Sequence, residues 1–220
     1  MRALRVLARI LGWLLTPLVA LAASFLGATF AATLLANDDD PRRALILRSL
    51  GVRFEVKVSN VDETLAPGED AERAAVRLAH AKAAAVARNE SRPVLAADTL
   101  VVCDGRILGK PASAADAADM LRLLSGRAHE VVTAVCLVSI GVPRTALART
   151  TVQFAALSEA EIAWYVATEE PLDKAGAYHV DGRGALFVAA ISGSPSNVAG
   201  LPVRTVLALA REAGLDLGLA

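Results

Sequence analysis

Helical and strand signals alternate along this chain from residue 41 onward, and this alternation limits the fold more than any other feature. Residues 52–58 alternate apolar and charged side chains, as a half-buried strand does. Residues 70–88 read as an alanine-rich helix, and residues 93–111 as an apolar strand, a tight turn at Asp104–Gly105 and a short return strand. Further strands and helices continue to a last helix at about 203–213. This pattern predicts an α/β fold.

Length and composition indicate one domain with an N-terminal addition. The chain has 220 residues, and its 23 basic and 23 acidic side chains balance, so it lacks the basic field that attracts nucleic acid. We therefore expect no nucleic-acid partner. Cys103 and Cys136 lie inside apolar runs, away from metal-ligand spacing. They are predicted to be reduced core residues, with a single disulfide as the alternative.

The N-terminus carries a long apolar segment. Residues 10–36 contain no charged side chain and follow three arginines. We place a boundary here, between an apolar extension at 1–33 and a catalytic domain at 34–220. The extension fits a membrane anchor better than a secretory signal, and a third reading makes "ATLLA" the first strand of the domain. The arginines would keep the N-terminus inside and send the domain outside.

Asp98 is the sharpest single clue to function. This carboxylate interrupts the apolar strand "PVLAADTLVVC", where burial without a partner is costly, so a metal, a lysine or an opening to a cleft must compensate. The alternative is an aspartate held by a neighbouring hydroxyl or turn N–H. Lys82 interrupts the apolar stripe of the preceding helix and is a natural partner, unless it extends from the helix edge to water.

Further charged residues lie in loops that this strand could share. Glu63, Lys110 and Lys174 are examples, although each taken alone could be a solvated surface residue. Carboxylates with lysines and arginines, without a Cys/His cluster, favour a hard divalent cation and phosphate oxygens over zinc. No Walker A loop, dinucleotide glycine fingerprint or Gly-x-Ser-x-Gly elbow is present.

A helix is predicted to begin at "DDDPRR". Arg42 and Arg43 at its start suit a phosphate, whereas Asp38, Asp39 and Asp40 oppose one. The alternative needs no ligand, because Asp40 can be an N-cap with Pro41 at the first helical position.

Several motifs together resemble the Maf family of nucleoside triphosphate pyrophosphatases over roughly residues 41–213. They are "VDET", "RLAHAKA", "AADTLVVCDGRILGKP", "MLRLLSGRAHEVVTAV", "EPLDKAGAY", "GRGALFV" and "GSPSNVAGLP". The resemblance implies a mixed central sheet with flanking helices and a cleft between two lobes, similar to the inosine triphosphate pyrophosphatases. It also implies a homodimer, and cleavage of a nucleoside triphosphate to the monophosphate and pyrophosphate with a divalent cation, magnesium or manganese.

The resemblance also assigns site residues. Asp98 falls at the proton acceptor, and Thr99 and Arg42 fall where the family has residues tied to substrate choice. With the residues considered above, the expected catalytic set is Asp98, Lys82 and Glu63, with Asp98 and Glu63 on the metal. The expected substrate-binding residues are Arg42, Arg43, Thr99, Lys110, Lys174 and Asp181.

Two departures from the family pattern matter. Residues 37–40 replace a serine-containing stretch, and Asp181 stands where members acting on thymidine and uridine triphosphates carry glutamine. An acceptor-only carboxylate cannot replace both amide functions. The rivals to a nucleotide-pool enzyme are a catalytically weak Maf-like protein acting in cell division and a membrane-tethered variant. Because nucleoside triphosphates and reduced thiols are cytosolic, we expect the domain in the cytoplasm.

Overall fold

The computed structural model describes residues 31–35 and 41–217. Its strands are β1 (Ala31–Leu35), β2 (Arg53–Val56), β3 (Val94–Cys103), β4 (Arg106–Leu108), β5 (Ala128–Ser139), β6 (Val142–Phe154) and β7 (Val188–Ser192). Its α-helices are α2 (Pro41–Ser49), α3 (Ala71–Ala87), α4 (Ala114–Leu124), α5 (Glu159–Val166), α6 (Pro195–Val198) and α7 (Val203–Glu212). Three 3-10 turns complete the set: η1 (Glu170–Asp173), η2 (Ala175–Ala177) and η3 (Arg183–Phe187). The predicted α/β class is confirmed.

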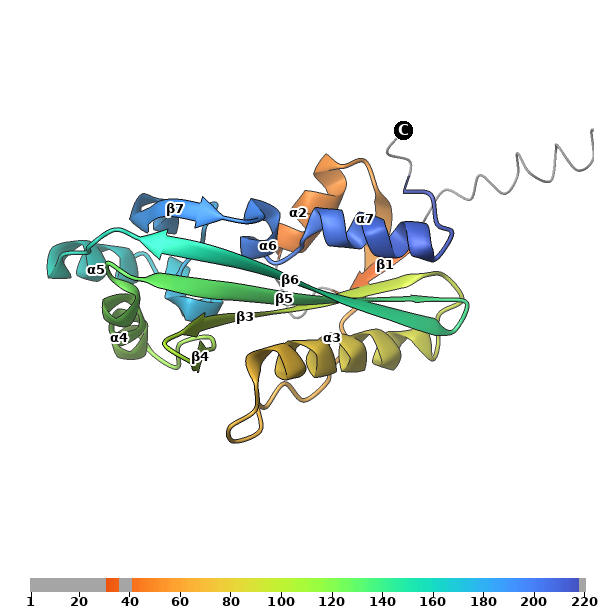
Figure 1. Ribbon diagram of the computed structural model, residues 1–220, viewed down its shortest axis with the longest axis horizontal. Helices are drawn as coiled ribbons and strands as arrows, with labels where there is room; N and C mark the ends of the chain where they lie inside the picture. The colour runs from red at the N-terminus through yellow and green to blue at the C-terminus, as the bar shows by residue number, and fades with distance from the viewer. Residues whose placement is uncertain (1–30, 36–40, 218–220) are drawn as a thin grey trace, which may run out of the picture.

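The strands form one mixed sheet, as the family resemblance implied (Figure 1). Its order is β2-β1-β3-β5-β6-β7, with β4 paired to β3 off this path. Strand β1 runs parallel to both of its neighbours, and β3, β5, β6 and β7 pair antiparallel. Strand β1 overlaps the "ATLLA" segment and belongs to the sheet. Residues 1–30 and the aspartates at 38–40 lie outside the described residues.

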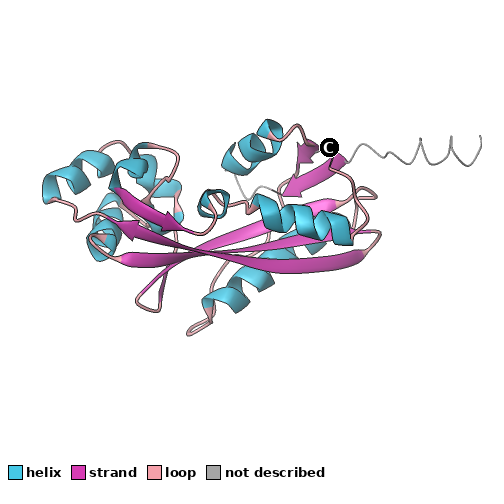
Figure 2. Ribbon diagram, turned by 45° about the horizontal axis from the view of Figure 1, so that its top comes forward, coloured by secondary structure: helices cyan, strands magenta, loops and turns pink. Residues whose placement is uncertain are grey.

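Helices cover both faces of the sheet (Figure 2). Because side chains alternate along a strand, Leu95 and Ala97 of β3 pack with α2 and α7, whereas Val94, Ala96 and Leu100 pack with α3. A third cluster lies under α4 and α5 at the far ends of β5 and β6. Three buried clusters therefore surround the central strands.

Strand β3 lacks a strand partner over four residues of one edge. Its other edge pairs with β5 from Val94 to Val102. On the first edge, β1 pairs with it only as far as Ala96, and β4 begins at Val101. Within the described part of the chain, residues 97–100 thus face an interruption in the sheet, which we call the β3 gap. It separates the part of the sheet under α2 and α7 from the part under α4 and α5.

Local predictions are mostly confirmed. Asp104 and Gly105 form the predicted turn with φ of 49° and 74°, and Ser158 begins α5 with a full capping box. Both cysteines are free and buried. Ser113 begins α4 by accepting from the N–H of Asp116, whose carboxylate accepts from Ala112 N–H.

The predicted burial of one face of β2 is wrong at two positions. Val56 and Val58 are each 48% exposed, whereas Val52 is buried. Strand β2 is the outermost strand of the sheet and ends at Val56, so Val58 lies beyond the hydrogen-bonded ladder. Across residues 31–35 and 41–217, no helix combines the length and apolar character needed to cross a bilayer.

Candidate active site

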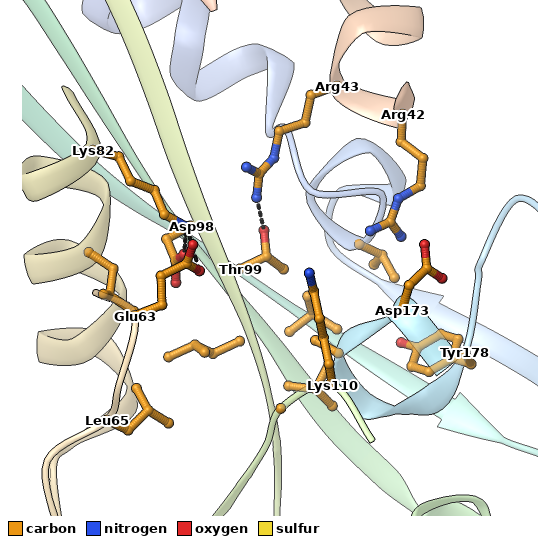
Figure 3. Close-up of a pocket in the computed structure, with 17 residues that line it drawn as sticks. Arg42, Arg43, Glu63, Leu65, Lys82, Asp98, Thr99, Lys110, Asp173 and Tyr178 are labelled. Atoms are coloured by element: carbon orange, nitrogen blue, oxygen red, sulfur yellow. Dashed lines mark hydrogen bonds and ion pairs between the residues drawn. The ribbon is translucent and has the colours of Figure 1, made fainter. Parts of the chain in front are cut away.

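A pocket of about 650 Å³ opens at the β3 gap (Figure 3). Neighbouring side chains of a strand point to opposite faces, yet both Asp98 and Thr99 line this pocket. The gap explains this, because without a strand at that edge a single cavity can reach both faces of the sheet. The predicted site residues that line it are Arg42, Arg43, Glu63, Lys82, Asp98, Thr99 and Lys110.

Lys82 joins two carboxylates on one side of the pocket. Its ammonium lies 2.5 Å from Oδ1 of Asp98 and 2.9 Å from Oε2 of Glu63. Lys82 is only 1% exposed and Asp98 5%, so these charges sit in a poorly hydrated place. Burying charges is costly unless they are paired, and this pairing satisfies that requirement. We call these three residues the Lys82 cluster; the predicted pairing of Asp98 with Lys82 is confirmed.

Each member of the Lys82 cluster is positioned by its own element. Lys82 lies on the buried face of α3, which Asp70 caps by accepting from two backbone N–H groups. Glu63 lies in the preceding loop, beside a turn in which Asp62 accepts from the backbone and hydroxyl of Thr64. Asp62 therefore shapes the loop that presents Glu63.

Arg43 closes the β3 gap from the opposite face. Its guanidinium donates to the carbonyl oxygens of Ala97 at 2.8 Å and Gly200 at 2.9 Å, and to Thr99 Oγ1 at 3.3 Å. The Ala97 carbonyl lies in the interrupted stretch, so Arg43 satisfies a strand acceptor that lacks a strand partner there. Arg43 lines the pocket as predicted, but these contacts give it a role in holding β3 to the Gly200 loop.

Arg42, Lys110 and Asp173 form the outer wall. Lys110 is exposed and extends from the end of β4 toward the space between Thr99 and Asp173 (Figure 3). The segment that carries it is fixed because Gly176 N–H donates to the carbonyl of Gly109 at 3.1 Å. A side chain at Gly176 would meet Val101 at 2.9 Å, so only glycine permits this approach.

Two predicted substrate residues lie outside the pocket lining. Lys174 pairs with Asp173, its neighbour in the chain, which does line the pocket. Asp181 is exposed in the loop between η2 and η3, past Tyr178. The pocket therefore brings together most of the predicted set, whereas Lys174 and Asp181 are not among its lining residues.

Tyr178 is a pocket residue that the sequence reading did not single out, although it ends the "EPLDKAGAY" motif. It is buried, and its hydroxyl lies 2.9 Å from Nε2 of His129. Both rings pack edge-to-face with Phe154. The aromatic cluster fixes the Tyr178 ring in the pocket wall. Its position at the end of this family motif was the only signal for it.

His129 should make stability depend on pH. Burial lowers the pKa of His129 from 6.5 to about 4, because the charged ring loses its hydration. The unfolded chain then binds the proton first, so stability is complete above about pH 6.5 and falls as pH drops toward 4. The loss is about 3 kcal/mol. We expect His129→Gln to flatten this part of a urea-unfolding series against pH, and exposed His80→Gln to leave it unchanged.

The Lys82 cluster suits a divalent cation that arrives with phosphate oxygens. Lys82 engages one oxygen of each carboxylate, which leaves Oδ2 of Asp98 and Oε1 of Glu63 for a ligand in the pocket. Magnesium commonly takes one or two carboxylates and completes its shell with substrate phosphates and water. The described residues hold no group of three or more His, Cys, Asp or Glu placed for a metal ion. The two carboxylates therefore fit a cation shared with substrate.

Comparison with known proteins identifies the family. A family model described as Maf-like protein matches residues 38–213, so the chain belongs to the family of Maf-like proteins. A dTTP/UTP pyrophosphatase of Anaeromyxobacter sp. (strain Fw109-5) is 49% identical over 192 residues, covering 85% of this chain and 92% of the relative. A protein of the same name from Myxococcus xanthus (strain DK1622) is 48% identical over 178 residues, covering 80% and 90%.

Solved structures also match. The Ham1 protein of Staphylococcus aureus aligns over 83% of this chain and 98% of its own, with a TM-score of 0.48 and 13% identity.

Proposed function

We propose that this protein hydrolyses nucleoside triphosphates to the monophosphate and pyrophosphate, and so removes non-standard or surplus nucleotides. The observation that carries the proposal is the Lys82 cluster, a buried lysine holding two carboxylates at the wall of an open pocket. Relatives of 48–49% identity that are named dTTP/UTP pyrophosphatases support the reaction. An intact cluster also favours an enzyme over a catalytically weak binding protein.

Asp98 is the proposed proton acceptor. The oxygen of a water molecule attacks the anhydride between the α- and β-phosphates, and Asp98 takes the proton that this water loses. Lys82 holds the Asp98 carboxylate in place through the 2.5 Å contact with Oδ1. A bond forms between the water oxygen and the α-phosphorus, the bond from the α-phosphorus to the bridging oxygen breaks, and pyrophosphate leaves with that oxygen.

We propose that the cationic side chains of the outer wall bind phosphate. Arg42 and Lys110 line the pocket and can neutralise the charge that develops on phosphate oxygens during the reaction. Asp98 and Glu63 would hold a divalent cation, magnesium or manganese, which supplies further neutralisation when bound. Arg43 contributes by keeping β3 and the Gly200 loop in register.

The proposed base is uracil or thymine, as the names of the relatives suggest. Thr99 faces the pocket, whereas Asp181 is exposed outside its lining. Lys174 also lies outside the lining, but its chain neighbours Asp173 and Ala175 belong to it. Both Lys174 and Asp181 keep their proposed substrate-binding roles.

The remaining proposals concern the whole chain. We propose a cytoplasmic homodimer whose catalytic unit follows the apolar extension. Free buried cysteines and a nucleoside triphosphate substrate support the cytoplasm, and the family resemblance supports the dimer. A boundary before residue 34 would cut through β1, which begins at Ala31, so a truncated protein should keep Ala31.

Pyrophosphate release by the full chain tests the function. We expect cation-dependent release from UTP or dTTP in a panel of standard and modified nucleoside triphosphates, with magnesium, manganese or a chelator. No release from a folded sample that still binds nucleotide would overturn the proposal and favour the binding protein.

A further inference from the structure

A line of buried hydrogen bonds leads away from the pocket through Thr99. Thr99 Oγ1 lies 3.0 Å from Oγ1 of Thr133, its direct partner across the β3–β5 ladder. Thr133 Oγ1 in turn lies 3.2 Å from the backbone oxygen of Asn197. Thr133 is completely buried and does not line the pocket, so it cannot contact a substrate itself.

The groups at the two ends of this line of hydrogen bonds determine which atom is the donor in each bond. A guanidinium only donates, so Thr99 accepts from Arg43 Nη2 at 3.3 Å. A backbone oxygen only accepts, so Thr133 gives its single hydroxyl proton to Asn197. The contact between the two threonines then requires Thr99 to donate. The bonds run one way, from Arg43 through Thr99 and Thr133 to the carbonyl, an order in which each bond polarises the next.

This direction decides what Thr99 offers to the pocket. Its proton is used by Thr133 and one lone pair by Arg43, which leaves one lone pair. We propose that Thr133 is a positioning residue that makes Thr99 a hydrogen-bond acceptor, so that Thr99 selects a nucleotide group carrying an N–H or O–H. A uracil or thymine N3–H and a sugar hydroxyl are the two sources of such a donor. The inference rests on the proposed function and refines its substrate choice.

Thr150 offers a matched control for Thr133, because it also contacts α6. Thr150 of β6 is buried, and its hydroxyl accepts from the Asn197 side chain at 3.0 Å and from Ser194 N–H at 3.0 Å. It therefore contacts α6 and its N-cap residue, as Thr133 contacts α6. It makes no hydrogen bond to Thr99. Loss of the Thr150 hydroxyl should loosen the attachment of α6 without changing the atom to which Thr99 donates its proton.

The test compares UTP with analogues that lack a hydrogen-bond donor either on the base or on the sugar. Pyrophosphate release is measured with UTP, with its N3-methyl analogue and with 2′,3′-dideoxyuridine triphosphate, which separates the base from the sugar. For the unaltered chain, kcat/KM should be lower by roughly tenfold or more for the analogue that lacks the donor bound by Thr99. Thr133→Val frees the Thr99 proton, so this penalty should shrink to about threefold or less. Thr133→Ser and Thr150→Val should keep the full penalty.

Each outcome decides the inference. If the unaltered chain turns over UTP and neither donor matters, Thr99 does not accept from the nucleotide and the inference fails while the proposed function stands. An equal loss of selectivity in Thr150→Val and Thr133→Val would assign the effect to loosening of α6, and this result would also overturn the inference. If Thr133→Val does not fold, Thr99→Val must abolish the penalty for the inference to hold. No release from any triphosphate would remove both proposals.

Discussion

Replacement of Asp98 by asparagine should lower kcat by about a thousandfold, within the range for loss of a general base. Asparagine has nearly the same size, but its amide cannot take a proton from water. Lys82 keeps its contact with Glu63, so the buried ammonium still has a carboxylate partner. We therefore expect the circular dichroism spectrum of the folded protein to persist while pyrophosphate release slows by this factor.

A control for this variant lies at the end of the same strand. Asp104 follows β3 directly, is exposed, and pairs with Arg127 at 2.6 Å. Asp104→Asn removes one carboxylate charge without touching the pocket, so its kcat should match that of the unaltered chain. Full turnover by Asp98→Asn, or loss of its folded spectrum, would contradict the assigned role.

Replacement of Lys82 by methionine should be the most destabilising single change in the pocket. Methionine fills a similar volume but leaves Asp98 buried without a cation. Removing one partner of a buried ion pair costs about 3–5 kcal/mol, because the remaining charge stays uncompensated. A urea-unfolding series should show this drop in the free energy of unfolding, and turnover should be lost with it.

Two further variants separate charge from packing. The double variant Lys82→Met/Asp98→Asn removes the uncompensated carboxylate, so it should recover part of the lost stability. Lys57→Met breaks the partly exposed pair with Glu90 and should shift the unfolding midpoint only slightly. If Lys82→Met and Lys57→Met shift the midpoint equally, the Lys82 cluster is not the buried network described above.

The sequence was informative where a charged residue broke an apolar pattern. Asp98 in an apolar strand and Lys82 on an apolar helix stripe each required a partner, and the structure pairs them at 2.5 Å. Thr133 interrupts the run "EVVTAVCLV" in the same way, although more weakly. A hydroxyl is easily satisfied by its own backbone surroundings, so periodicity alone did not mark it as part of the site.

Other features depended on contacts that periodicity cannot express. Arg43 lines the pocket, and its predicted role in substrate binding stays a prediction. The sequence did not show that it also spans the β3 gap, which exists because β1 ends before β4 begins. Lys174 belongs to a family motif and Asp181 lies between two of them, yet neither is among the residues that line the pocket. Val56 and Val58 alternate correctly for a strand, but their exposure follows from the outermost position of β2.

The contact between Arg43 and Gly200 also bears on how the protein folds. It joins residues 157 positions apart, whereas β5 and β6 meet through a turn around Gly141. Contacts between distant residues form late, because a long stretch of chain must be ordered before they can close. During synthesis, the antiparallel strands can assemble before the Gly200 segment has been made. The pocket is then completed only when the C-terminal segment reaches Arg43, so an incomplete chain could build the sheet but not the finished site.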